Sequence, residues 1–160
     1  MNYYDKSENA IIAVDFDGTI SRRPYERSPL DEPPQDGFVE FYKNITTKYK
    51  GEMIIALHTS RYLVGDNDYW ATRKYLERWG LTEIYFPKRD GHTFKNIEGD
   101  TYTSRTYFGV NTKIPCFLVI DDINVGCPKL PNGELDWNKI YNTVVEEYEK
   151  CKEYWRNKDV

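Results

Sequence analysis

The sequence predicts an α/β fold in which a parallel sheet forms the centre of a single domain, residues 1–160. Three apolar runs have the length of buried strands, at 10–14, 53–57 and 115–120, and segments with the periodicity of amphipathic helices lie between and after them. Each run ends in polar residues, which is where the strands of a parallel sheet bind ligands. A chain of 160 residues can bury such a core without disulfides or a structural metal.

The first half of the chain alternates between strand and helix. After the strand at 10–14, a loop at 21–34 is rich in proline, arginine and acidic residues. A helix is expected from near Asp36, because apolar side chains then recur every three or four positions: Phe38, Phe41, Tyr42 and Ile45. Gly51 turns the chain into the second strand at 53–57.

A second helix is predicted over 68–79, followed by Gly80 at a position where helix ends favour glycine. Residues 81–86 then predict a short third strand. The segment 87–112 is polar, with several glycine, threonine and tyrosine residues, and we expect it to form a small insert, either a hairpin or a flap.

A long helix is expected to end the chain. Pro131, Asn132 and Gly133 are typical turn residues, and Asp136 has the side chain of a helix N-cap. The residues that follow carry an apolar stripe at helical spacing: Trp137, Ile140, Val144, Tyr148 and Cys151. The sequence shows no internal repeat, linker or second domain.

Composition argues against several classes of protein. With a formal net charge of −4, the chain has no basic footprint, so we expect no general nucleic-acid binding. Its 3 cysteines lack Cys-x-x-Cys spacing and favour a reducing compartment over a disulfide framework. The first residues are polar and no apolar run approaches about 18 residues, so we expect no signal peptide and no membrane contact, and predict a cytoplasmic protein.

The strongest chemical signal lies directly behind the first strand, in Asp15, Asp17, Gly18 and Thr19. The strand end places Asp15 at the lip of a crevice, where it can act as a nucleophile, and Asp17 can act as general acid and base. Gly18 permits a tight turn and close approach of backbone N–H groups to an anion, while Thr19 offers a hydroxyl. These properties suit phosphoryl transfer. The alternative is a strand that simply runs into an Asp and Gly turn.

Polar residues from all three strands are expected to meet at one edge of the sheet: Asp15 and Asp17, Thr59 and Ser60, and Asp121 and Asp122. Each pair of carboxylates about 4 Å apart repels by roughly 4 kcal/mol, so a cation is needed among them. Oxygen ligands with open positions suit Mg²⁺. We predict that Asp15, the main-chain carbonyl of Asp17, and Asp121 or Asp122 bind this ion.

A phosphoryl group at this edge also needs partners of its own. We predict a lysine that neutralises the nucleophile and the phosphoryl group: Lys113 first, with Lys95 and Lys88 as substitutes. Arginine pairs with phosphate through two hydrogen bonds, which favours Arg61 as a further partner, although a solvated surface position is the alternative. The predicted phosphate-binding residues are Gly18, Thr19, Thr59, Ser60 and Arg61.

Taken together, these residues resemble the haloacid-dehalogenase (HAD)-like superfamily of aspartate-nucleophile phosphatases, over nearly the whole chain. The resemblance is carried, in the order of the family's four motifs, by Asp15 to Thr19, Thr59 with Ser60, Lys113, and Asp121 with Asp122. Within the family, the chain is similar to a small subgroup of capless phosphatases. The resemblance implies a three-layer Rossmann-like fold with no full cap domain, since only one loop and one helix fit between Thr19 and Thr59.

The resemblance also implies an activity, namely Mg²⁺-dependent hydrolysis of a small phosphomonoester through an aspartyl-phosphate on Asp15. A nucleotidase or polynucleotide-end phosphatase is the alternative reaction. A receiver-like phosphoacceptor is disfavoured because no suitable aspartate ends the 81–86 strand, and an inactive binding module because every motif residue is present. We expect the insert at 87–112, the first loop or a partner subunit to cover the site. The last of these would make the protein a homo-oligomer.

Overall fold

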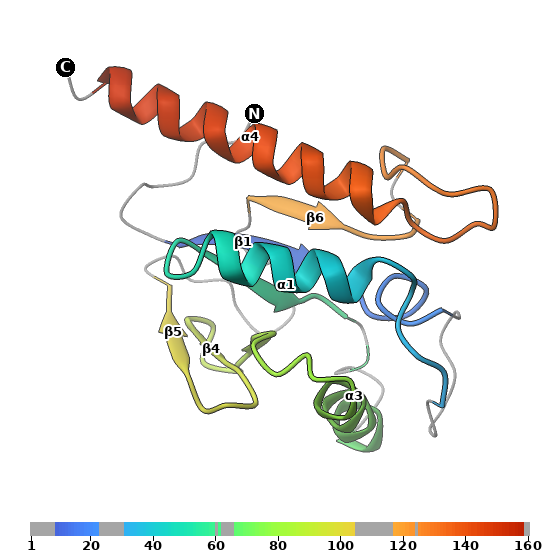
Figure 1. Cartoon of the computed structure of the whole chain (residues 1–160). Helices are drawn as coiled ribbons and strands as arrows, with labels where there is room; N and C mark the ends of the chain where they lie inside the picture. Colours follow the sequence, from blue (N-terminus) through green and yellow to red (C-terminus); the bar gives the residue numbers. More distant parts are fainter. Residues whose placement is uncertain are drawn as a thin grey trace.

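A parallel sheet at the centre of the molecule determines where the polar strand ends lie (Figure 1). The structure is a computed structural model that describes residues 9–22, 31–59, 61, 66–104, 117–123 and 125–158. Within this part of the chain the parallel sheet has the order β2 (Met53–Leu57), β1 (Ala10–Val14), β6 (Leu118–Ile120). Val14 lies opposite Leu57 on one side and Ile120 on the other. The predicted α/β fold with a parallel sheet is confirmed, and the three strands end at one edge.

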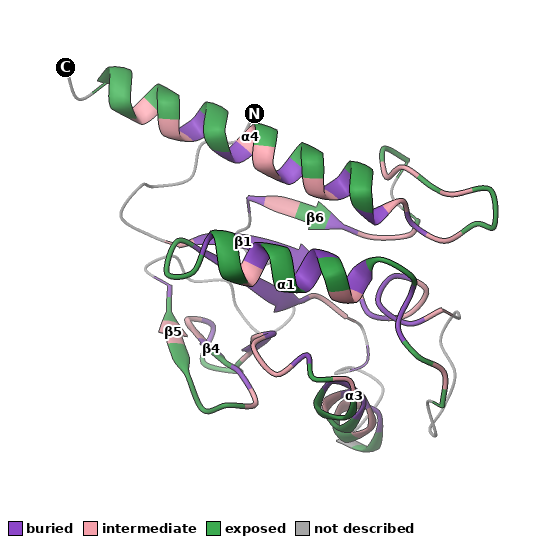
Figure 2. Ribbon diagram, in the orientation of Figure 1, coloured by how far each residue is buried: buried purple, intermediate pink, exposed green. Residues whose placement is uncertain are grey.

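Two helices, α1 (Phe38–Lys48) and α4 (Trp137–Lys158), pack their apolar stripes into one hydrophobic core with alternate residues of β1 and β2. Figure 2 shows the buried residues of both helices as stripes along ribbons whose remaining residues are largely exposed. The predicted stripes of both helices are buried in full. The N–H of Lys139 donates to Asp136 Oδ1 at 3.2 Å, which confirms the predicted N-cap.

The helix predicted over 68–79 is α3 (Asp66–Arg78), so it begins two residues earlier and ends one residue earlier. Tyr75 and Leu76 bury its inner side in the main core. Gly80 follows with a φ of 73°, and the Leu81 N–H donates to the Leu76 carbonyl at 2.8 Å. The expected glycine at the helix end is therefore confirmed. Among the described residues, no helix has the length and apolar content that crossing a membrane requires.

The expected third strand at 81–86 differs from the structure. Only Tyr85 joins the parallel sheet, through an isolated bridge to Ala56, whereas the Ile84 N–H donates back to the Leu81 carbonyl in a turn. The chain then enters a separate antiparallel sheet, in the order β3 (Phe86–Pro87), β4 (Thr93–Lys95), β5 (Thr101–Thr103). Pro87 has no N–H to donate, which disfavours longer pairing inside a sheet.

The antiparallel sheet is packed against the central one. Phe94 of β4 is fully buried in a second cluster with Ile11, Ile54 and Ala56, and Tyr85 and Tyr102 lie against it. The part of the predicted insert at 87–104 is therefore a hairpin that covers the second face of the parallel sheet; residues 105–112 lie outside the described part of the chain. A layer of helices on that face is not seen in the described residues.

Candidate functional site

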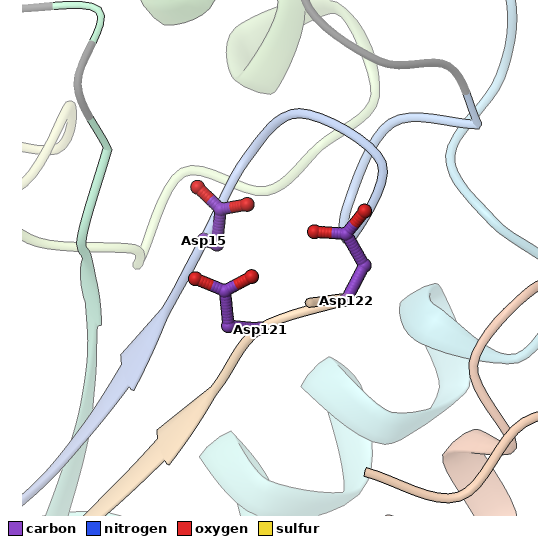
Figure 3. A group of neighbouring side chains, drawn as sticks. All are labelled: Asp15, Asp121 and Asp122. Carbon is purple, nitrogen blue, oxygen red and sulfur yellow. The ribbon is translucent and has the colours of Figure 1, made fainter. Parts of the chain in front are cut away.

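Three carboxylates come together at the edge where the parallel strands end. Asp15 follows β1 directly, and its N–H donates to the carbonyl of Ile120 at 2.9 Å, which holds the ends of β1 and β6 side by side. Asp121 and Asp122 follow β6. Each of the three offers a carboxylate oxygen within 4.8 Å of the other two, and Figure 3 shows their side chains pointing toward a common space. The predicted convergence of the first and last polar strand ends is thus present.

The charge on Asp15 is poorly compensated in this arrangement. Burial, followed by the nearby charge of Asp121, raises the pKa of Asp15 from 3.8 to about 7, although a hydrogen bond from the Phe16 N–H opposes the shift. Burial and Asp121 also raise the pKa of Asp122. Within the described part of the chain no lysine or arginine forms an ion pair with any of the three. Burial and the nearby acidic charge therefore disfavour the ionised forms of Asp15 and Asp122, and a positive charge beside them would favour those forms.

The loop behind β1 is built around Gly18 and Thr19. Gly18 has a φ of 73°, a backbone conformation that favours glycine, and a Cβ on it would come within 2.6 Å of Asp122 Oδ2 and displace that carboxylate. Thr19 is fully buried, and its hydroxyl lies 3.4 Å from oxygens of both Asp15 and Asp122. The same hydroxyl accepts a hydrogen bond from the Asp122 N–H at 3.0 Å. Thr19 thus joins two of the carboxylates.

The anion contacts predicted for this loop stay predictions. The Gly18 N–H donates to Ser21 Oγ at 3.2 Å, and the Thr19 N–H donates to the Phe16 carbonyl at 3.3 Å. Both groups therefore have partners inside the loop in this structure.

Sequence reasoning missed Gln35. Its side chain is buried, donates to the Gly18 carbonyl at 2.7 Å and to the Ser21 carbonyl at 3.3 Å, and accepts from the Leu135 N–H at 3.0 Å. It therefore ties the loop behind β1 to the segment that precedes α4. A lone glutamine in a polar loop gives no periodic or motif signal, so the sequence offered nothing to single it out.

Asp17 has surroundings quite unlike those of Asp15. Its carboxylate accepts three hydrogen bonds from Arg61: Nε donates to both oxygens at 3.1 and 3.0 Å, and Nη2 donates to Oδ1 at 2.6 Å. The Arg61 side chain is fully buried and also lies 3.6 Å from Asp68 of α3. Arg61 was expected to bind phosphate or to lie on a solvated face. The solvated position is ruled out by its burial, and the phosphate contact stays a prediction.

The remaining predicted residues are only partly placed. Thr59 follows β2, is partly exposed and accepts a hydrogen bond from the Arg61 N–H at 3.3 Å. Ser60 and Lys113 lie outside the described residues, so the predicted third-motif lysine is not located. The two substitutes, Lys88 and Lys95, belong to the turn after β3 and to β4, and neither pairs with a carboxylate of the site among the described residues.

The donor set suits a hard divalent cation. Three carboxylates supply oxygen ligands only, their mutual repulsion is relieved by a positive ion, and they open toward one another. The cluster contains Asp15 and both candidates for the last carboxylate ligand, Asp121 and Asp122, and their binding of Mg²⁺ stays a prediction. Asp17 does not join the cluster through its carboxylate, which Arg61 occupies, so its predicted contribution through the main-chain carbonyl stays a prediction.

Comparisons with known proteins add no further assignment: no protein-family model, curated protein or solved structure matches the chain. What can be inferred about function therefore follows from the geometry at the end of the parallel strands.

Proposed function

We propose that the chain is a Mg²⁺-dependent phosphomonoester hydrolase with a three-layer Rossmann-like fold of the HAD-like type, without a full cap domain. One observation carries the proposal. A carboxylate at the end of a central parallel strand, Asp15, lies beside Asp121 and Asp122. In the loop behind this strand, the Thr19 hydroxyl contacts Asp15 and Asp122, and Gly18 leaves room for the Asp122 carboxylate. This arrangement combines a nucleophile and a cation site in one place.

In the first half-reaction an ionised oxygen of Asp15 attacks the phosphorus of the ester. A new bond forms between that oxygen and phosphorus while the bond from phosphorus to the leaving oxygen breaks, and its electron pair stays on the leaving oxygen. Asp17 supplies the proton that this oxygen takes up. The products are a free alcohol and an aspartyl-phosphate on Asp15.

In the second half-reaction Asp17, now ionised, accepts a proton from a water molecule. The water oxygen bonds to phosphorus, the bond from phosphorus to the Asp15 oxygen breaks, and Asp15 recovers its carboxylate. Inorganic phosphate leaves, and Asp17 holds the proton that begins the next cycle. Atoms and charge balance over the two halves with water as the only co-substrate.

Asp15, Asp121 and Asp122 are the residues that would hold Mg²⁺. When bound, the ion neutralises the carboxylates and the phosphoryl oxygens. The raised pKa of Asp15 supports this assignment, because a nucleophile needs its ionised form and nearby positive charge favours that form.

The direct test is a phosphatase screen of the purified chain with Mg²⁺, using aryl phosphates, sugar phosphates, nucleotides and 3′- or 5′-phosphorylated oligonucleotides. We expect release of inorganic phosphate from at least one class, loss of activity with chelator, and its return when Mg²⁺ is restored. Turnover of nucleotides or oligonucleotide ends above the other classes would favour the nucleotidase or end-phosphatase alternative. Full turnover in excess chelator, or none of the substrates hydrolysed, would contradict the proposal.

A further inference from the structure

Arg61 is a buried residue beside the proposed proton donor, Asp17. Its side chain is fully buried, which is unusual for arginine, and it lies between two acidic side chains and an aromatic ring. Asp17 receives three of its hydrogen bonds, Asp68 lies 3.6 Å from Nη1, and the guanidinium carbon is 5.0 Å from the centre of the Phe16 ring. A buried guanidinium needs partners that offset the loss of hydration, and the two carboxylates supply them.

We propose that Arg61 is a positioning residue: it fixes the direction of the Asp17 carboxylate for proton transfer, and Asp68 secures Arg61 from α3. This inference rests on the proposed phosphatase function. The supporting geometry is the fork of Nε and Nη2, which engages both oxygens of Asp17 and leaves its carboxylate plane little freedom to rotate. Without Arg61, the carboxylate of Asp17, which lies in a loop, would be freer to rotate.

The fork also distinguishes the two oxygens of Asp17. Oδ1 accepts from both Nε and Nη2, whereas Oδ2 accepts only from Nε among the bonds that Arg61 makes. A carboxylate oxygen offers about two acceptor positions. Oδ2 is therefore the oxygen with a position left for the transferred proton, and Arg61 determines which oxygen that is.

Asp68 connects this arrangement to α3. It is buried, and α3 packs Tyr75 and Leu76 into the main core, so the carboxylate that faces Arg61 is mounted on a rigid element. Asp17, by contrast, lies in the loop behind β1. The orientation of the proton-transfer group is therefore set from a helix that begins five residues after Arg61 rather than from its own loop.

The test compares two matched aryl esters, phenyl phosphate and 4-nitrophenyl phosphate, with Mg²⁺ present. The 4-nitrophenolate leaves without needing a proton, whereas phenolate depends on one. Arg61→Met should lower kcat for phenyl phosphate about tenfold or more relative to 4-nitrophenyl phosphate, while KM for both changes little. Arg61→Lys should give a smaller change in the same ratio, because lysine keeps the charge but loses the fork.

A matched control is Arg22→Met. Arg22 is also an arginine paired with two carboxylates, at 2.6 Å from Asp36 and 2.9 Å from Glu134. Its loss should leave the ratio of the two kcat values as in the wild type. If a folded Arg61→Met variant also keeps the wild-type ratio, Arg61 does not position the proton donor and the inference is wrong.

Two further arms keep the result decisive. In an Asp17→Asn background, Arg61→Met should cause no additional loss of kcat with phenyl phosphate, and multiplicative losses would overturn the inference.

Should Arg61→Met fail to fold, Asp68→Asn, which leaves Arg61 and Asp17 in place, must shift the ratio of the two kcat values in the same direction. Failure of the proposed function looks different: the wild type would then hydrolyse neither ester, although calorimetric unfolding of the single and double variants would still report coupling between Arg61 and Asp17.

Discussion

Asp15 and Asp17 are separated by one residue, yet the fold places them in opposite electrostatic surroundings. Asp15 faces two more carboxylates, and its pKa is raised to about 7 by burial and by Asp121. Asp17 faces a buried guanidinium that donates three hydrogen bonds to it. Among the described residues, a guanidinium is paired with Asp17, whereas no lysine or arginine is paired with Asp15.

This difference indicates a division of labour within a single loop. The carboxylate cluster can change its charge when a cation arrives, which suits a group that must bind metal and attack phosphorus. Three hydrogen bonds from the buried Arg61 guanidinium hold the Asp17 carboxylate, which suits a group that must be correctly oriented before the substrate binds. Four predictions test the two halves of this comparison.

The largest effect is expected at the nucleophile. Asp15→Asn preserves the shape of the side chain but removes the attacking oxygen, so turnover of 4-nitrophenyl phosphate should fall about 10⁴-fold or more. Circular dichroism should show that the fold is retained. A folded variant with most of its activity would show that the cluster does not supply the nucleophile.

Asp17→Asn should have a smaller effect of a different kind. Proton transfer contributes about 10² to 10⁴-fold, so steady-state turnover should fall by that factor while Asp15 can still be phosphorylated by an activated ester. Rapid quenching and mass spectrometry should then detect a phosphorylated chain. Wild-type turnover in this variant, or the same total loss as in Asp15→Asn with no phosphorylated chain, would remove the distinction between the two carboxylates.

Mg²⁺ should stabilise the folded chain through the cluster alone. At about 100 times the dissociation constant the gain in the free energy of unfolding is about 2.7 kcal/mol. Asp121→Asn should abolish most of the rise in Tm caused by Mg²⁺, as measured by scanning calorimetry. Glu146→Gln, which alters an exposed carboxylate of α4, is the control and should keep the full rise. An equal rise in both variants would place the ion elsewhere.

The smallest expected effect is a pH dependence of the metal-free chain. The pKa of Asp15 is about 7 when folded and near 3.8 when unfolded, so its contribution to stability is complete below about pH 4 and is lost as pH rises toward about 7. Asp15→Asn removes this loss. The variant should therefore gain more in Tm over the wild type at pH 8 than at pH 5, and added Mg²⁺ should shrink the gain at pH 8. Equal gains at both pH values would mean that burial and the neighbouring carboxylates do not raise the pKa of Asp15 in the folded chain.

Much of the fold could be predicted because its signals are local. The strands at 10–14 and 53–57 are continuous apolar runs, and the stripe of α4 follows the helical period, so burial could be inferred without knowing any partner. The strand expected at 81–86 was wrong in most of its length because a short apolar run is equally compatible with a buried turn. There, Leu81 and Ile84 lie in the core without joining a sheet.

For the candidate site, the chemical groups at the strand ends follow from the order of residues along the chain, since a parallel sheet brings Asp15, Asp121 and Asp122 to one edge whatever the details of packing. The neighbours of each group depend on how distant segments pack together. The contact between Asp17 and Arg61 spans 44 positions and depends on how α3 and the loop behind β1 pack. No pattern of spacing encodes such a contact, because burial and side-chain direction arise from the whole fold.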